Sequence, residues 1–281
     1  MNRTPGRFSH GPTSKTLTAD LTLYVRTDGS NNNTGLANTA AGAFLTAEYA
    51  VAVILNTMNG GGHTVTIKMG DGTYTIAAGN GIMVDRPFNG SIVIQGNTGN
   101  ASAVILDGST NSPTATLWAT GGGVFTAEYL KLRSGALSAA SLGAIVGGVV
   151  YFSNIVFGKA TNNHVYANRA GYLEQTGNCQ LDSEGVTSFT FAESTHHGDI
   201  RVGSVDLALL ANITVTYFAY SSSLADITYT GSPTITLSGH TASGQRYMAD
   251  TNSIIQAIGL GATFFPGNVA GSTATGAIYS A

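Results

Sequence analysis

The spacing of apolar residues changes from a helical to a strand pattern near residue 63. The stretch 46–58 contains no glycine or proline, and its larger apolar side chains recur on one face of a helix. The residues of this face are Tyr49, Val53, Ile54 and Met58. We expect one amphipathic helix here, with Thr46 as its N-cap and the glycines at 60–62 following its end.

Beyond this stretch, apolar residues alternate with polar ones, as they do in strands. Val65, Ile67 and Met69 fall on one face of such a strand, and the residues between them fall on the other. Short apolar segments recur about every 20–25 residues down the chain, separated by turns rich in glycine and asparagine. Their positions are 65–69, 92–95, 103–106, 124–132, 145–157, 188–191, 213–218, 234–237 and 254–258.

Three all-β architectures compete for this pattern. A β-sandwich requires hairpin dipeptides and longer alternating runs, and a propeller requires a four-strand motif repeated every ~40–50 residues. A right-handed parallel β-helix requires coils of about 20 residues, with very short strands, small turn residues and a cap over the open end. The third fits best. We predict an all-β, right-handed parallel β-helix (a solenoid) of roughly nine coils at ~22 residues each, with an N-terminal capping helix.

This architecture divides the chain into four segments. Residues 1–20 are polar and mildly basic, which predicts an extended arm or, alternatively, a disordered terminus. Residues 21–62 supply a first strand and the capping helix, and residues 63–243 form the β-helix trunk. Residues 244–281 predict a C-terminal cap and trimer-contact segment, in which the FFPG stretch at 264–267 closes the core.

Composition narrows the classes of function. Only 10% of the residues are charged, against about 25% in an ordinary globular domain, and 37 residues are glycine. The net charge of −3 comes without a basic cluster, so we expect no nucleic-acid partner. No apolar run reaches ~18 residues and the N-terminus has no signal-peptide pattern, so we expect no membrane insertion. Cys179 is the only cysteine, which excludes an intrachain disulfide.

Several motifs point to a known family. They are YVRTDGSNNNTGL at 24–36, AFLTAEYAV at 43–51, HTVTIKMGDGTYT at 63–75 and GQRYMADTNSIIQAIGLGATFFPGNVAGSTATGAIY at 244–279. Together they resemble the pectate-lyase-like β-helix proteins of phages and prophages. That resemblance implies a homotrimeric tail spike, tail fibre or related adhesion protein. It also implies contacts to other virion proteins through residues 1–20 and to a bacterial surface glycan. Such a protein is located in the virion, being made in the host cytoplasm and released by lysis.

Carboxylates are the first candidates for catalytic chemistry. A glycosidase needs two of them about 5–10 Å apart, and the densest polar stretch is 172–201. Asp182 and Glu184 share one face of an extended segment, and Glu193 and Asp199 lie further along the chain. If successive coils stack these residues, a catalytic group forms. The alternative is that they are solvated charges on the outer surface.

No other catalytic or metal-binding signature is present in the sequence. The basic residues that a polysaccharide lyase needs are scattered singly, without an aspartate cluster beside them. His196 and His197 are adjacent, so they meet a common ion only if they lie in a turn. We expect no metal and no cofactor.

Aromatic side chains offer a second route to sugars. Trp118, Tyr151, Tyr172 and Tyr217 are candidates for lining a glycan groove, although aromatics at strand spacing also serve in cores and interfaces. The sequence therefore favours a phage virion structural or adhesion protein, of tail-spike or tail-fibre type, that binds a host glycan without catalysis. One alternative is a glycan depolymerase on the same β-helix, a glycoside hydrolase or polysaccharide lyase acting on bacterial surface polysaccharide. A bacterial surface or secreted β-helix protein is the third.

Overall fold

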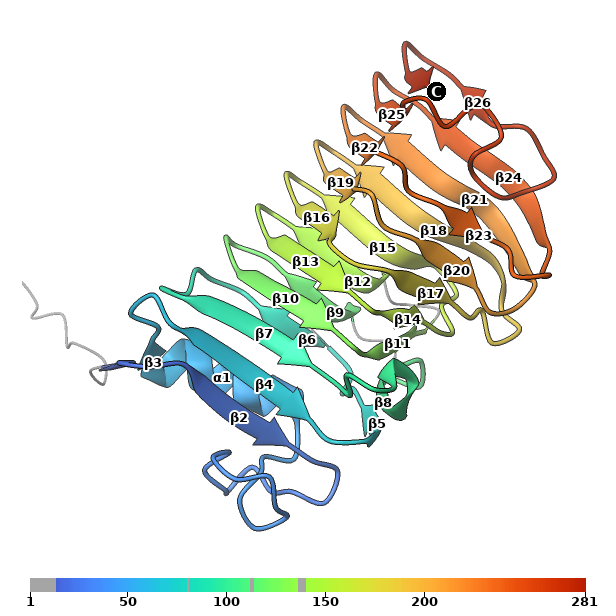
Figure 1. The fold of residues 1–281 in the computed structure, drawn as a ribbon. Helices are drawn as coiled ribbons and strands as arrows, with labels where there is room; N and C mark the ends of the chain where they lie inside the picture. Colours follow the sequence, from blue (N-terminus) through green and yellow to red (C-terminus); the bar gives the residue numbers. More distant parts are fainter. Residues whose placement is uncertain (1–13, 80, 112–113, 136–139) are drawn as a thin grey trace, which may run out of the picture.

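The chain winds into a parallel β-helix whose coils stack along one axis (Figure 1). The computed structural model describes residues 14–79, 81–111, 114–135 and 140–281. Within these ranges, every pair of neighbouring strands is parallel, as in Val65 beside Ile92 and Tyr172 beside Asp199. The predicted fold class is therefore confirmed. None of the described helices has the length and apolar character that a membrane span requires.

Three sheets form the faces of the β-helix. The long sheet has ten strands, here given in spatial order. They are β2 (Leu21–Val25), β4 (Thr64–Met69), β7 (Ser91–Gln95), β10 (Val124–Glu128), β13 (Val149–Ser153), β16 (Tyr172–Gln175), β19 (Asp199–Val202), β22 (Asp226–Tyr229), β25 (Ile254–Ala257) and β27 (Ile278–Ser280).

The other two large sheets have eight and seven strands. The eight-stranded sheet consists of β6 (Ile82–Val84), β9 (Ala115–Ala119), β12 (Ala140–Ile145), β15 (Asn163–Asn168), β18 (Thr187–Thr195), β21 (Ile213–Ser222), β24 (Ala242–Ala249) and β26 (Ser272–Thr273). The seven-stranded sheet consists of β5 (Gly72–Thr75), β8 (Val104–Gly108), β11 (Lys131–Ser134), β14 (Val156–Phe157), β17 (Cys179–Leu181), β20 (Leu207–Leu209) and β23 (Ile235–Thr236). From β4 to β24, the chain passes through the long, the seven-stranded and the eight-stranded sheet in turn, and a short 3-10 helix, η1 (Ala101–Ala103), precedes β8.

The sequence separation of equivalent positions varies from coil to coil: some steps fall within the predicted 20–25 residues and others are longer. One of the shorter steps along the long sheet pairs Val149 with Tyr172, whereas a longer one pairs Val93 with Thr126. Strand length ranges from two residues in β26 to ten in β21, and the turns vary in length as well, so the repeat is irregular. The length of each coil decides which residues of neighbouring coils lie side by side.

Alternation within the strands builds the core. Val65, Ile67 and Met69 are buried as predicted, and Thr66 and Lys68 between them are partly exposed. In register with Val65, the inward positions of the next coils carry Ile92, Phe125, Val150, Leu173, Ile200, Ile227 and Ile255. Stacking of like apolar side chains therefore produces one continuous core along the axis.

The capping helix α1 (Ala47–Thr57) lies at the N-terminal end and packs against β2, β4 and β6 (Figure 1). Thr46 is its N-cap, as predicted, and Thr46 Oγ1 accepts a hydrogen bond of 3.3 Å from Tyr49 N. The predicted apolar face is confirmed in part, because Ile54 is buried and Val53 and Met58 are partly buried against the core. The buried side is formed by Ala47, Ala50, Val51 and Ile54, and Tyr49 is 39% exposed. The small alanines allow the helix to approach the sheets closely, so Ala47 and Ala50 share the buried side with the larger Val51 and Ile54.

The two ends of the β-helix are closed by different structures. At the C-terminal end, the predicted plug residue Phe265 is fully buried, and its ring packs against Tyr229 at 5.1 Å between centroids. At the N-terminal end, residues 1–13 of the predicted arm lie outside the described residues. The remainder joins the body of the protein, because β1 (Lys15–Thr16) pairs in parallel with β3 (Met58–Asn59).

Candidate functional site

The four candidate carboxylates occupy three different faces of the β-helix. Asp182 and Glu184 follow β17 of the seven-stranded sheet, Glu193 lies on β18 of the eight-stranded sheet, and Asp199 begins β19 of the long sheet. The structure brings Asp182 and Glu184 together and separates them from the other two. The cause is coil length: residues 182 to 199 turn two corners of one coil instead of completing it.

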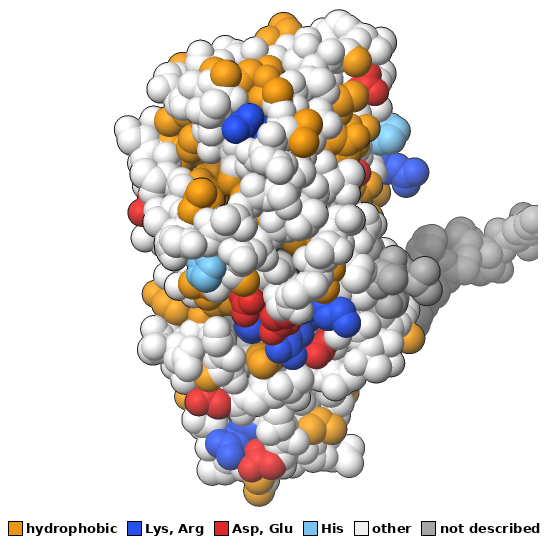
Figure 2. Space-filling view, turned by 90° about the vertical axis from the view of Figure 1, so that its right-hand side faces the viewer, with side chains coloured by type: hydrophobic (Ala, Val, Ile, Leu, Met, Phe, Trp, Pro, Cys, Tyr) orange, Lys and Arg blue, Asp and Glu red, His pale blue; other side chains and the backbone are white. Residues whose placement is uncertain are grey.

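Asp182 and Glu184 belong to a network of ion pairs with two basic residues. Arg133 grips Glu184 through two hydrogen bonds, of 2.6 Å from Nη2 and 2.7 Å from Nε. Lys131 Nζ lies 3.0 Å from Asp182 Oδ2 and 2.7 Å from Glu184 Oε1, and Arg133 also contacts Asp107 at 3.3 Å. Acidic and basic side chains gather in this way on the face shown in Figure 2, which is otherwise sparsely charged.

This network keeps Glu184 ionised. Burial alone would raise the pKa of Glu184, but the hydrogen bonds from Arg133 and Lys131 outweigh it and lower the pKa to about 2. A general acid needs the opposite shift, because it must hold its proton near neutral pH. We therefore interpret these residues as a clamp that ties β8 and β11 to the segment after β17.

A second group of polar and aromatic side chains lies on the outer face of the long sheet. Because the strands alternate, residues 172 and 174 point outward while Leu173 is buried between them. The register then places Tyr172 beside Asp199 and Glu174 beside Arg201, and Asp199 beside Asp226 on the next strand. With the neighbouring Tyr151, these six residues are called the long-sheet site below.

Short contacts hold the long-sheet site in one arrangement. Tyr172 donates a hydrogen bond of 2.6 Å from its hydroxyl to Glu174 Oε2. Arg201 pairs with Asp199 at 2.9 Å, and its guanidinium carbon lies 5.4 Å from the centroid of the Tyr172 ring, as in a cation–π contact. The Tyr151 and Tyr172 rings meet edge to face at 6.2 Å. Side chains fixed in advance lose less entropy when a ligand binds.

The long-sheet site borders a hollow of about 470 Å³. A volume of this size falls within the usual range for small-molecule sites. Its lining is formed by Tyr172, Glu174, Arg201, Gly203, Asp226, Thr228, Thr230 and Gln256. Most of these side chains carry hydrogen-bonding groups and one is aromatic, a combination that suits a hydroxylated ring.

Two aspartates in the site have different environments. Asp199 is paired with Arg201, whereas burial and the neighbouring charge of Asp199 raise the pKa of Asp226. Sequence reasoning singled out Asp199 but missed Asp226 and Glu174. The signal was present: Tyr172, Asp199 and Asp226 follow each other at equal intervals, and that interval is the local coil length.

The four aromatic candidates divide into two groups. Tyr151 and Tyr172 lie together in the long-sheet site, while Trp118 and Tyr217 lie on β9 and β21 of the eight-stranded sheet. Trp118 is only 7% exposed, so it offers little surface to a ligand. Tyr217 stacks on Tyr220 at 5.3 Å between ring centroids. The long sheet therefore combines aromatics with a cluster of charges.

No group of three or more potential metal ligands occurs among the described residues. His196 and His197 do lie in a turn, after β18, with positive φ angles of 51° and 64°. Burial raises the pKa of the Cys179 thiol to about 12, so it is not a reactive nucleophile. The two polar clusters described above are formed by carboxylates, basic side chains and tyrosines.

Comparison with known proteins identifies the fold. No family model and no curated protein matches the chain. Among solved structures, pectin methylesterase from carrot is similar, with a TM-score of 0.50 and 14% identity, over 92% of this chain and 82% of the carrot chain. The Escherichia coli protein YbhC is similar over 92% of this chain and 77% of its own, with a TM-score of 0.41 and 13% identity. The chain thus shares the parallel β-helix fold with the carrot protein.

Proposed function

We propose that this protein is a non-catalytic, glycan-binding adhesion protein of a phage virion, of tail-spike or tail-fibre type. The observation that carries the proposal is the long-sheet site, where two tyrosines stand beside two aspartates, a glutamate and an arginine. The motifs that resemble phage and prophage β-helix proteins support the virion context. The fold supports it as well, because it is shared with a protein named for a polysaccharide substrate.

The long-sheet site supplies both kinds of contact that a sugar requires. The C–H face of a sugar ring is apolar and packs against the face of an aromatic ring such as Tyr151 or Tyr172. Sugar hydroxyls donate to Glu174 and Asp226 and accept from Arg201. The site lies on a rigid sheet, so that binding does not require a loop to become ordered.

The assembly follows from the same proposal. Three copies form a homotrimer, residues 1–20 attach it to other virion proteins, and the long sheet faces the bacterial surface glycan. The protein reaches its place in the virion from the host cytoplasm and is released by lysis. Its mass in solution tests the trimer directly: about three times the 28.7 kDa of one chain is expected, and a stable monomer would contradict it.

Binding of host surface polysaccharide tests the site. Replacing both Tyr151 and Tyr172 by alanine should weaken binding at least tenfold, which corresponds to about 1.4 kcal/mol. Tyr217→Ala is the matched control, because it removes a tyrosine of the eight-stranded sheet. It should leave the affinity within twofold. If the control loses binding and the double variant keeps it, the glycan binds to the eight-stranded sheet and not to the long sheet.

A second candidate function is hydrolysis of the bound glycan at Asp199 and Asp226. Strand neighbours are about 4.8 Å apart, close to the ~5–5.5 Å that separates the carboxyl groups of retaining glycosidases. Asp226, whose pKa is raised by burial, would give its proton to the leaving oxygen as the glycosidic bond breaks. Asp199 would attack the anomeric carbon, and water would then hydrolyse the resulting ester.

Reducing ends released from host polysaccharide separate the two functions. The adhesion proposal expects none above the background. Release that is abolished by Asp226→Asn and by Asp199→Asn, but not by Asp182→Asn, would establish hydrolysis at this site. The Asp182 variant is the control because that residue follows β17 of the seven-stranded sheet, away from the long-sheet site.

A further inference from the structure

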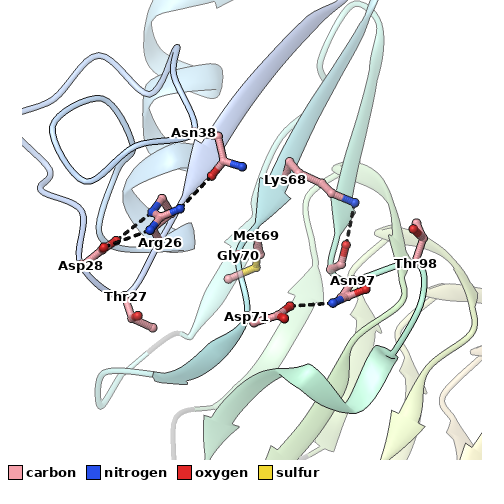
Figure 3. Close-up of a pocket in the computed structure, with 11 residues that line it drawn as sticks. Arg26, Thr27, Asp28, Asn38, Lys68, Met69, Gly70, Asp71, Asn97 and Thr98 are labelled. Atoms are coloured by element: carbon pink, nitrogen blue, oxygen red, sulfur yellow. Dashed lines mark hydrogen bonds and ion pairs between the residues drawn. The ribbon is translucent and has the colours of Figure 1, made fainter.

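A polar pocket lies near the N-terminal end of the β-helix, apart from the long-sheet site. It is formed by the segment after β2, the turn between β4 and β5, and the turn after β7 (Figure 3). The cavity measures about 540 Å³, within the usual range for small-molecule sites. Two strands, β10 and β13, separate β7 from β16, which at ~4.8 Å per step puts these two strands on the order of 14 Å apart.

Hydrogen bonds fix the walls of the pocket. On one side, Arg26 grips Asp28 at 2.8 and 3.0 Å and donates to Asn38 Oδ1 at 3.3 Å. On the other side, Asn97 donates to Asp71 Oδ1 at 2.8 Å. This pair lies across the cavity from Arg26, Asp28 and Asn38 (Figure 3). The walls are therefore arranged before any ligand arrives.

Lys68 adds a positive charge to the pocket, and its ammonium group is hydrogen-bonded only to neutral acceptors. Its Nζ donates to Gln95 Oε1 at 2.6 Å and to Gly96 O at 2.8 Å. Within the described part of the chain, Lys68 retains a third N–H without a partner. Asp71 Oδ2 and the amide N–H groups of Asn38 are likewise unpaired there. Donors and an acceptor thus border the same cavity.

The lining determines which ligand fits. Eight of its side chains carry polar groups, and Met69 is the only apolar exception besides two glycines. An apolar ligand would leave the polar groups unpaired. The charges cancel, since Arg26 and Lys68 are matched by Asp28 and Asp71, so the pocket has no net attraction for an anion or a cation. Ligand groups must both donate and accept, which is the property of hydroxyls.

We infer that this pocket binds an uncharged saccharide of one or two units through its hydroxyl groups, with Asp71 accepting from them and Lys68 and Asn38 donating to them. It is a second sugar site, independent of the long-sheet site. A glycan end held here and a chain packed along the long sheet would be separate contacts.

The test uses the full chain and a panel of neutral sugars: methyl glucoside, methyl galactoside, methyl mannoside, sucrose and maltose. Nuclear magnetic resonance titration should show millimolar binding of at least one of them, with shifts at the side-chain amides of Asn38 and Asn97. Glucuronate and glucosamine, which carry a charge, should bind at least fivefold more weakly than the best neutral sugar. Absence of binding by the whole panel, or a preference for a charged sugar, would overturn the inference.

Two variants locate the binding. Asp71→Asn keeps the shape and the oxygen that accepts from Asn97 but removes the negative acceptor, and it should weaken binding at least fivefold. Gly70→Ala adds a methyl group to the floor, where the new carbon would meet Arg26 Cγ at 3.4 Å, an ordinary contact. It should fold normally and weaken binding by a similar factor.

The Tyr151→Ala, Tyr172→Ala double variant should bind the small sugars as the wild type does. Loss of polysaccharide binding in that variant, with small-sugar binding retained, separates the two sites. If instead small-sugar binding is lost in the double variant and kept in Asp71→Asn, the sugars bind at the long-sheet site and the pocket has no such role.

Discussion

Asp199 and Asp226 occupy equivalent positions on adjacent strands of the long sheet, one coil apart in sequence. Their environments differ, because Arg201 pairs with Asp199, while Asp226 is partly buried and lies beside the charge of Asp199. A parallel β-helix makes such pairs readily, since each coil places its residues directly on the previous coil. The same stacking rule accounts for the core, the ion-pair network and the candidate site.

Asp226→Asn should stabilise the protein at neutral pH. Burial, followed by the charge of Asp199, raises the pKa of Asp226 in the folded state, so the folded protein binds this proton more tightly than the unfolded chain does. The stability from Asp226 is therefore present below its unfolded pKa of 3.8 and is lost as the pH rises. Urea unfolding should show a higher midpoint for the variant at pH 7.5 and no gain at pH 3. A lower midpoint at pH 7.5 would contradict the environment described.

Glu184→Gln should destabilise the protein by about 2 kcal/mol at pH 7, because Glu184 accepts charge-assisted hydrogen bonds from Arg133. The folded pKa of about 2 is below the unfolded value of 4.5. The stabilisation is therefore present above pH 4.5 and is lost as the pH falls toward 2. Asp85→Asn, which breaks the exposed pair with Arg86, should cost below about 0.5 kcal/mol in the same unfolding assay. Equal costs for both variants would contradict the clamp.

Thr46→Ala should cost about 1 kcal/mol through loss of the N-cap of α1. Thr57→Ala, at the other end of the helix, removes a hydrogen bond of 2.7 Å to Val53 O on the exposed surface. It should change the free energy of unfolding by below about 0.5 kcal/mol. Chemical denaturation measures both, and an inert Thr46→Ala would argue against Thr46 as the cap.

The helix shows how far sequence reasoning reaches. Thr46 was predicted from local rules that depend on neighbouring residues alone, and the structure confirms it. The face of the helix was predicted from the largest apolar residues, whereas the sheets select the small residues Ala47 and Ala50. How closely a helix approaches a sheet depends on the residues of both, and the sequence of the helix alone does not show which sheet residues it meets.

The candidate site shows a similar division. Tyr151, Tyr172 and Asp199 were singled out from their type and spacing, and all three lie on the outer face of the long sheet. Asp226 was missed because the coil length assumed from the sequence is shorter than the local coil that separates it from Asp199. When the assumed coil length is too short, the residue predicted to lie beside Asp199 is the wrong one. The sequence pattern alone does not give the register between coils.

Phe265→Ala should destabilise the C-terminal end by about 3–5 kcal/mol, because Phe265 is fully buried and contacts the rings of Phe218 and Tyr229. Its removal leaves a cavity under the last coils. Ile258→Ala is the control, because Ile258 is 58% exposed and should cost below about 0.5 kcal/mol. Hydrogen exchange should rise first in β24 and β25. Unchanged exchange in these strands would contradict the role of Phe265 as a plug.

A crystal structure of the protein with a fragment of its host polysaccharide tests the long-sheet site most directly. We expect intact sugar rings packed on Tyr151 and Tyr172, with hydroxyls bonded to Glu174, Arg201 and Asp226. A fragment bound only to the eight-stranded sheet would contradict the location of the site. A cleaved fragment, or a sugar bonded covalently to Asp199, would contradict the absence of catalysis.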